Sequence, residues 1–198
     1  MGAIKKIWRL IHNMELIKFE KVRDGRYLKN YEITYRNKAG KDKKYEIVSR
    51  KNLESPADLG AKVSGVSIVA TCNNKLLLLH EFRMGINRTI YNLCAGMLEE
   101  DETIEECIAR ELYEETGLKL KIVKRILPPS FSAVAISDIT TYIAFVEVTD
   151  ENISDHTSEN EEIHAAFYSK EQVNKLLDTE YFSSRAQMAA YFFTKSVI

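Results

Sequence analysis

The sequence is poor in the residues that mark secreted, zinc-bound or disulfide-linked proteins. Its 198 residues include three cysteines, three prolines and one tryptophan. Cys72, Cys94 and Cys107 are an odd number, match no zinc-binding spacing and lie in apolar runs, so we expect buried, reduced thiols. The four histidines are scattered and form no helical pair of metal ligands. These shortages argue against a disulfide framework and a histidine-based metal centre.

Long hydrophobic runs and an excess of one charge are also missing. No segment approaches the roughly 18 continuous apolar residues of a membrane span, and no signal-peptide core is present. The 28 basic and 29 acidic residues leave a net charge of −1, so bulk electrostatics do not draw the chain to nucleic acid. We expect a cytoplasmic protein that binds neither nucleic acids nor membranes.

The chain divides by its pattern into an N-terminal segment, residues 1–58, and a main domain, residues 59–198. Ile4, Ile7, Trp8 and Ile11 have helical spacing with basic residues between them. Such a helix suits a membrane surface or, as we favour, a site on its own domain or on a partner subunit. Three β-rich runs follow at 16–22, 27–35 and 43–48, separated by turn residues, and predict a small antiparallel sheet.

The main domain alternates strand and helix patterns. Apolar runs at 63–70 and 75–80 are joined by Asn73-Asn74, a pair suited to a tight turn, and predict a hairpin. A loop is expected at 84–89, a helix at 103–116, strands at 120–126 and 141–148, a short strand at 163–168 and two closing helices. An acidic loop at 149–162 precedes the short strand. The order indicates an α/β domain.

The predicted helix at 103–116 has one apolar face and one acidic face. Ile104, Cys107, Ile108 and Leu112 form the apolar stripe, which we expect to face a sheet. Glu111, Glu114 and Glu115 are three or four residues apart and share another face. At about 4 Å and an effective dielectric near 20, each repulsion between them costs on the order of 4 kcal/mol. Positive charge is therefore expected beside this face.

Two sources of positive charge are available to these acids. Arg110 precedes Glu114 by four residues and could hold that carboxylate, which leaves Glu111 and Glu115 to converge on a cation. Ligands that are all oxygen select Mg²⁺, or Mn²⁺, over zinc. The alternative is a solvent-exposed acidic helix, but two glycines, one arginine and four glutamates at fixed spacings make chance a poor explanation.

Residues 96–118 fit G-x5-E-x7-R-E-U-x-E-E-x-G-U, with U aliphatic, at every fixed position. They resemble the Nudix box. The resemblance implies an α/β/α sandwich with a mixed sheet, joined here to the small N-terminal antiparallel segment. It also implies Mg²⁺-dependent hydrolysis of a nucleoside diphosphate linked to another group. Glu111 and Glu115 occupy the metal-ligand positions, and Arg110 and Glu114 belong to the candidate catalytic set.

Three further stretches resemble the ADP-ribose pyrophosphatase group. Arg83, in Glu-Phe-Arg at 81–83, would bind a phosphate or ribose, although a solvent-facing arginine at a strand end fits equally well. The string Asn-Leu-Cys-Ala-Gly at 92–96 would supply the Ala95 carbonyl as a metal ligand. In the acidic stretch 158–164, Glu161 would complete the metal shell and Glu159 would act as general base, with a solvated acidic loop as the alternative.

The resemblance favours ADP-ribose as substrate, with AMP and ribose 5-phosphate as products, and a homodimer completed by the N-terminal segment. Two departures weaken the substrate assignment. Ser132 and Ala133 stand where relatives often have a proline, and Ile139 follows Ser137-Asp138 where an acid is common. Other nucleotide sugars, dinucleoside polyphosphates and nucleoside triphosphates therefore remain alternatives. A nucleotide-sensing Nudix module without activity is the alternative of another class.

Overall fold

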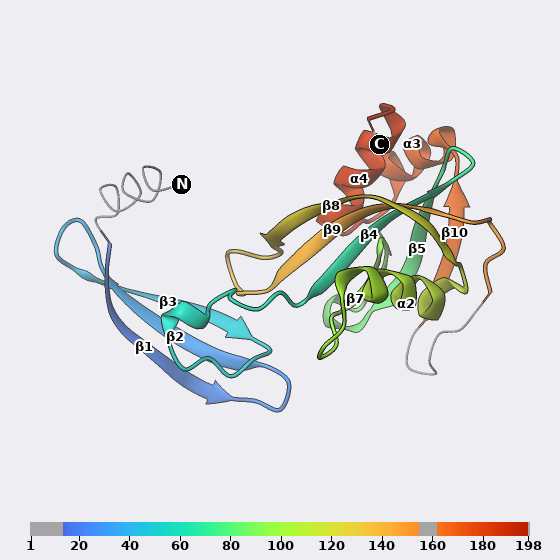
Figure 1. Ribbon diagram of the computed structural model, residues 1–198. Helices are drawn as coiled ribbons and strands as arrows, with labels where there is room; N and C mark the ends of the chain where they lie inside the picture. The colour runs from blue at the N-terminus through green and yellow to red at the C-terminus, as the bar shows by residue number, and fades with distance from the viewer. Residues whose placement is uncertain (1–13, 155–161, 198) are drawn as a thin grey trace, which may run out of the picture. The chain divides into compact units, whose positions relative to one another are not determined.

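The computed structural model describes residues 14–154 and 162–197, arranged in two compact units (Figure 1). The helix expected near the N-terminus lies outside the described residues. One unit contains the described residues up to Lys62 together with Phe131–Thr140. The other contains Val63–Ser130 and the described residues from Thr141 onward. No helix in the described ranges is long and apolar enough to cross a membrane.

The smaller unit is a three-stranded antiparallel sheet with its own apolar core. Its strands are β1 (Glu15–Asp24), β2 (Lys29–Arg36) and β3 (Asp42–Ser49), in the order β1-β2-β3, and a short 3-10 helix, η1, covers Pro56–Asp58. Tyr31, Ile33, Ile47 and Leu53 are buried together. The Tyr31 hydroxyl accepts a hydrogen bond from the Leu53 amide at 2.7 Å. The sheet expected from the sequence is confirmed.

The segment Phe131–Thr140 belongs to this smaller unit although it follows the box helix in sequence. The Val48 amide donates to the Ile136 carbonyl at 2.8 Å, and the Tyr45 hydroxyl donates to the Ala135 carbonyl at 2.7 Å. No periodicity in the sequence signals this packing, because it joins residues about ninety positions apart through backbone carbonyls.

The larger unit is built on a seven-stranded mixed sheet. Five strands have the order β10-β5-β4-β9-β8, while β6 pairs with β5 and β7 pairs with β4. Strands β4 and β9 are parallel, and β4 and β5 are antiparallel. The elements are β4 (Gly65–Cys72), β5 (Lys75–Arg83), η2 (Met84–Ile86), β6 (Arg88–Asn92), β7 (Cys94–Met97), α2 (Ile104–Thr116), β8 (Leu120–Phe131), β9 (Thr140–Val148), β10 (Ile163–Tyr168), α3 (Lys170–Thr179) and α4 (Ser184–Thr194).

Helices cover both faces of this sheet, which confirms the α/β/α sandwich (Figure 1). Because side chains alternate along a strand, Leu77 and Leu79 of β5 face α2, whereas Leu76 and Leu78 face α3 and α4. The predicted apolar stripe of α2 packs into the first of these cores, with Cys107, Ile108 and Leu112 fully buried. All three cysteines are buried and form no disulfide, as expected. The sheet is thus buried on both sides.

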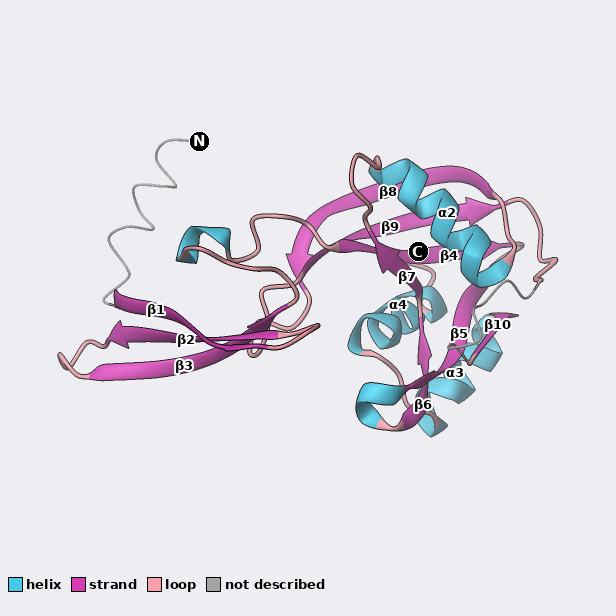
Figure 2. Cartoon of the chain, turned by 90° about the horizontal axis from the view of Figure 1, so that it is seen from below, coloured by secondary structure: helices cyan, strands magenta, loops and turns pink. Residues whose placement is uncertain are grey.

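Strands β4 and β5 are paired only beside their hairpin turn. Asn73 and Asn74 both have positive φ, as a two-residue turn with this twist requires. Beyond Leu76 the partners change, and β4 pairs with β7 while β5 pairs with β6 (Figure 2). The sequence pattern did not predict β6 and β7, which span five and four residues. They bring β5, β7 and the end of α2 to one place.

The ends of α2 follow the box sequence. Thr103 is the N-cap and accepts from the Glu106 amide, while the Glu106 side chain accepts from the Thr103 amide. Gly117 ends the helix with φ of 71°, a left-handed conformation that favours glycine. The helix expected at 103–116 is therefore confirmed with both of its ends.

We predict that Tyr31→Phe destabilises the protein by about 1–3 kcal/mol, because the buried Leu53 amide loses its acceptor. Urea unfolding followed by far-ultraviolet circular dichroism measures the change. Tyr27→Phe is the matched control, since the Tyr27 ring is exposed and should tolerate the loss of its hydroxyl. Equal destabilisation by the two variants would contradict the assigned role of the Tyr31 hydroxyl.

Candidate active site

The three acids in the last turns of α2 differ in burial: Glu111 is buried, Glu115 is partly buried and Glu114 is exposed. Glu111 is 8% exposed and faces β7, and Glu115 is one helical turn further along. A Cβ atom placed on Gly96 would overlap the Glu111 carboxyl group, so a larger residue there would have to displace this side chain. The side chain of Glu114 is 56% exposed. Burial therefore distinguishes acids that the sequence placed together on one helical face.

Arg110 joins the box loop to the box helix. Its guanidinium makes a two-point ion pair with Glu102, Nε to Oε1 at 2.7 Å and Nη2 to Oε2 at 2.9 Å. It also contacts Glu111 at 2.7 Å, Glu114 at 3.0 Å and the Met97 carbonyl at 2.9 Å. The expected contact with Glu114 is present, but Glu102, which the sequence assigned no partner, makes the fullest contact. This ion pair lowers the pKa of Glu102 to about 2.

Glu115 lies in surroundings that oppose its charge. Burial raises its pKa to about 8, although hydrogen bonds from the Cys94 thiol and the Ala95 amide act in the other direction. The Ala95 amide donates to its Oε2 at 3.2 Å. Burial also raises the pKa of Glu111. Without further positive charge, Glu115 favours the protonated form at neutral pH.

A polar pocket of about 290 Å³ opens beside Glu115. Its lining includes Arg83 from β5, Ala95 from β7 and Glu115 from α2. The structure therefore brings together three residues assigned to the site from sequence. Glu162, next to β10, also lines the pocket. Glu159 and Glu161 lie outside the described residues, so their roles as general base and metal ligand stay predictions.

The chemistry of this pocket fits a hard divalent cation. Its candidate donors are carboxylate oxygens and a backbone carbonyl, the ligands that suit Mg²⁺ and Mn²⁺. The pKa values of Glu111 and Glu115, raised by burial, also show where positive charge would be favourable. Within the described ranges no three acid, cysteine or histidine side chains are gathered as a metal site. The assignment of Glu161 as a further ligand stays a prediction.

Glu81 lines the pocket but carries no role in the sequence-based prediction. Glu81, on β5, has a side chain only 6% exposed, and its Oε1 accepts from the Asn92 amide group at 2.6 Å. Asn92 Oδ1 in turn accepts from the Ser183 hydroxyl at 2.6 Å. The signal available in the sequence was an acid at the inward-facing position of an otherwise apolar strand. Ser183, the hydrogen-bond partner of Asn92, is 91 residues away in the sequence, so no local pattern indicated this contact.

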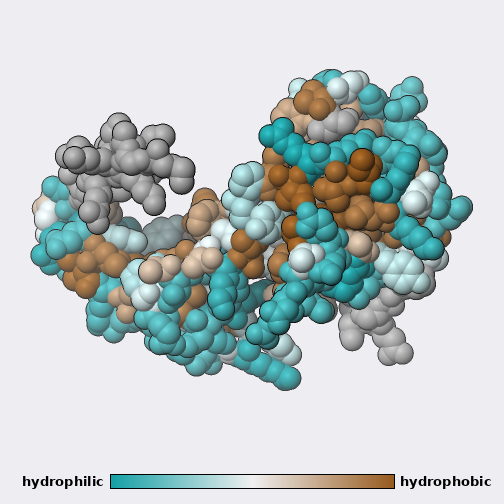
Figure 3. All heavy atoms as spheres, viewed as in Figure 1, coloured by the Kyte–Doolittle hydropathy of each residue, from teal (hydrophilic) through white to brown (hydrophobic). Residues whose placement is uncertain are grey.

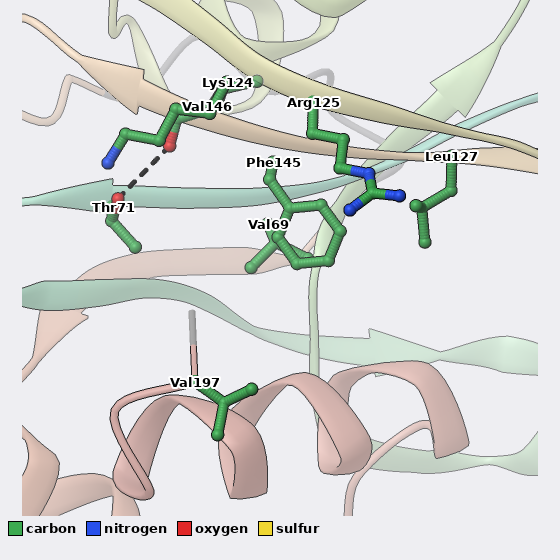
Figure 4. A pocket seen from close by; sticks show the side chains of 8 residues that line it. All are labelled: Val69, Thr71, Lys124, Arg125, Leu127, Phe145, Val146 and Val197. Atoms are coloured by element: carbon green, nitrogen blue, oxygen red, sulfur yellow. Dashed lines mark hydrogen bonds between the residues drawn. The ribbon is translucent and has the colours of Figure 1, made fainter.

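The other large hollows of this unit have a different character. One, of about 390 Å³, is lined by Val69, Phe145, Leu127, Arg125 and other residues without a carboxylate (Figure 4). A second hollow shares part of this lining and extends along α4 to Met188. It lies within the apolar surface over β8, β9 and α4 (Figure 3). Neither hollow offers acidic metal ligands, so the smaller pocket beside Glu115 is the candidate active site.

We predict that Gly96→Ala destabilises the protein, because the added methyl group displaces the Glu111 carboxyl group from its place beside β7 and from its ion pair with Arg110. Overpacking of this kind costs about 1–3 kcal/mol. Thermal unfolding measures the loss. Gly85→Ala is the control, because a methyl group there meets nothing within 4 Å. A Gly96→Ala protein as stable as the wild type would contradict the described packing.

The raised pKa of Glu115 predicts that the metal-free protein loses stability as the pH rises from about 5 to about 8. In this interval the folded protein holds a proton that the unfolded chain, with a glutamate pKa near 4.3, has released. Urea unfolding at both ends of the interval tests the sign. Glu115→Gln should remove most of the slope, since an amide does not ionise. A wild-type stability that rises over this interval would contradict the assignment.

Comparisons with known proteins agree with this geometry. The family model of the NUDIX domain matches residues 61–191. The GDP-mannose pyrophosphatase of Yersinia enterocolitica is 29% identical over 97 residues, 46% of this chain. The mouse ADP-sugar pyrophosphatase is 25% identical over 138 residues, 67% of this chain. These matches span only 50% and 61% of the two relatives' own lengths.

The fold has a counterpart among solved structures. A crystal structure described as an ADP compounds hydrolase superposes with a TM-score of 0.69 and 18% identity, over 93% of this chain and 94% of the other. At this identity the likeness concerns the fold. The family match, in contrast, covers well over half of the chain and includes the whole of α2 with the loop before it. The chain belongs to the Nudix family.

Proposed function

We propose that the protein is a Mg²⁺-dependent diphosphatase that hydrolyses a nucleoside diphosphate linked to another group. ADP-ribose is the favoured substrate, with AMP and ribose 5-phosphate as products. The observation that carries the proposal is the placement of Glu115, Ala95 and Arg83 around one polar pocket. A relative named as an ADP-sugar pyrophosphatase supports the substrate class. Mn²⁺ would serve as an alternative cation.

Within this proposal the metal would be held by Glu111, Glu115, the Ala95 carbonyl and Glu161. A bound divalent cation neutralises the diphosphate and stabilises charge on the attacking and leaving oxygens. Arg83 lies at the pocket and would bind phosphate oxygens through its planar guanidinium. Arg110 holds Glu111 and Glu114 in fixed orientations. These residues position the substrate rather than react with it.

The bond changes assign the remaining role to a base. A water oxygen forms a bond to one phosphorus, the bridging phosphorus–oxygen bond breaks, and the bridging oxygen leaves with the other phosphate. The proton released by the water would go to Glu159 as general base. The proposal includes a cytoplasmic homodimer completed by the N-terminal segment, as the family resemblance implies.

We predict that Glu115→Gln folds as the wild type and lowers the rate of hydrolysis by at least about a hundredfold, since a metal ligand supplies several kcal/mol in the transition state. Initial rates with Mg²⁺ are measured on ADP-ribose, GDP-mannose, a dinucleoside polyphosphate and a nucleoside triphosphate. Product analysis in ¹⁸O water identifies the phosphorus that is attacked. Glu105→Gln, an exposed position on the same helix, is the control and should keep its rate.

Three results would count against this proposal. Near wild-type turnover by a well-folded Glu115→Gln enzyme would remove the metal assignment. Cleavage of nucleoside triphosphates alone would exclude the ADP-ribose assignment and leave the family intact. Nucleotide binding without turnover would instead indicate a sensing module.

A further inference from the structure

The row of side chains on β5 changes from apolar to charged where the strand reaches the pocket. Leu77 and Leu79 pack in the core beneath α2. Since alternate residues share one face of a strand, Glu81 and Arg83 continue the same row. Both line the pocket that contains Glu115. The Glu81 side chain is almost fully buried, whereas that of Arg83 is 58% exposed.

A chain of hydrogen bonds fixes one oxygen of Glu81. Ser183, the N-cap of α4, donates its hydroxyl proton to Asn92 Oδ1, and Asn92 Nδ2 donates to Glu81 Oε1, both at 2.6 Å. The bond from Ser183 sets the orientation of the Asn92 amide, so its NH₂ group faces Glu81. A buried carboxylate requires such partners, because an unpaired one is strongly destabilising. Glu81 is therefore built into the fold and does not rotate freely.

The second oxygen of Glu81 is directed to Arg83. Glu81 Oε2 lies 3.5 Å from Arg83 Nη1. Among the described residues, the pocket lining contains three acids, Glu81, Glu115 and Glu162, and one basic residue, Arg83. A half-exposed arginine side chain has many rotamers available to it. An acid fixed on the same strand face favours the rotamer that keeps the guanidinium beside Glu81.

We propose that Glu81 is a positioning residue for substrate binding: held by the Ser183–Asn92 chain, it orients Arg83 to receive the diphosphate of the substrate. This inference rests on the proposed function. Glu81 itself does not contact the reacting atoms. Its effect is to reduce the rotational freedom that Arg83 would lose when a phosphate binds, so it acts on substrate affinity more than on the chemical step.

The test is a double-mutant cycle on Glu81 and Arg83. Glu81→Gln should raise the KM for ADP-ribose about tenfold, the effect of one charge-assisted hydrogen bond, and change kcat by less than about threefold. In the Arg83→Ala background the same substitution should change KM by less than about twofold, because Glu81 acts through Arg83. Independent, additive effects of the two substitutions would overturn the proposal.

A second variant guards against a general effect on folding. Glu81→Gln with Asn92→Asp keeps a buried amide–carboxylate pair but moves the charge away from Arg83. We expect a Tm within about 2 °C of the wild type and a KM that stays raised. A wild-type KM in this double variant would overturn the proposal. It would show that substrate binding needs the hydrogen-bonded amide–carboxylate pair and does not need the negative charge at position 81.

Two binding measurements separate this role from metal binding. The affinity for the α,β-methylene analogue of ADP-ribose, measured by calorimetry with Mg²⁺, should fall with Glu81→Gln in proportion to the rise in KM. Mn²⁺ affinity without nucleotide, measured by electron paramagnetic resonance, should change by less than about threefold. A parallel loss of Mn²⁺ affinity would contradict a role through Arg83. Absence of hydrolysis by the wild type would instead contradict the proposed function.

Discussion

The Glu111 carboxyl group occupies the space that a side chain at Gly96 would need, and the packing of α2 against β7 at the site depends on this arrangement. Gly96 has no side chain, so the acid of the helix occupies the space beside the strand. The buried carboxyl is held there by Arg110, which also binds Glu102 and the Met97 carbonyl. One guanidinium thus ties the helix to the loop that precedes it. The spacing of Gly96, Glu102, Arg110 and Glu111 in the box is consistent with these contacts.

The divergence of β4 and β5 turns this packing into a binding site. Because β7 and β6 fill the space between the two strands, the end of β5 comes to lie beside Ala95 and Glu115. Burial raises the pKa of Glu115 to about 8 and also raises that of Glu111, so positive charge would be favourable beside both acids. Arg83, at the end of β5, adds the positive charge suited to phosphate. The divergence of β4 and β5 therefore both forms the pocket and brings its charged residues together.

The elements with strong periodicity were predictable from sequence, and those fixed by distant contacts were not. The stripe of Ile108 and Leu112 predicts both the helix and its buried face, and Asn73-Asn74 predicts the hairpin. Strands as short as β6 and β7 carry too few residues for a pattern. The Ser183–Asn92–Glu81 chain depends on the tertiary approach of α4 to β6, which no local pattern encodes. Glu159 and Glu161 stay predictions from the resemblance alone.

The central claim is that the buried acids of α2 face a divalent cation. The most direct measurement is anomalous X-ray diffraction from a crystal of the protein grown with Mn²⁺ and a diphosphate analogue that cannot be cleaved. The account predicts a Mn²⁺ peak within about 2.3 Å of a Glu115 carboxylate oxygen, at the pocket shared with Ala95. Strong Mn²⁺ peaks elsewhere on the protein, with Glu111 and Glu115 bound to no metal, would contradict it.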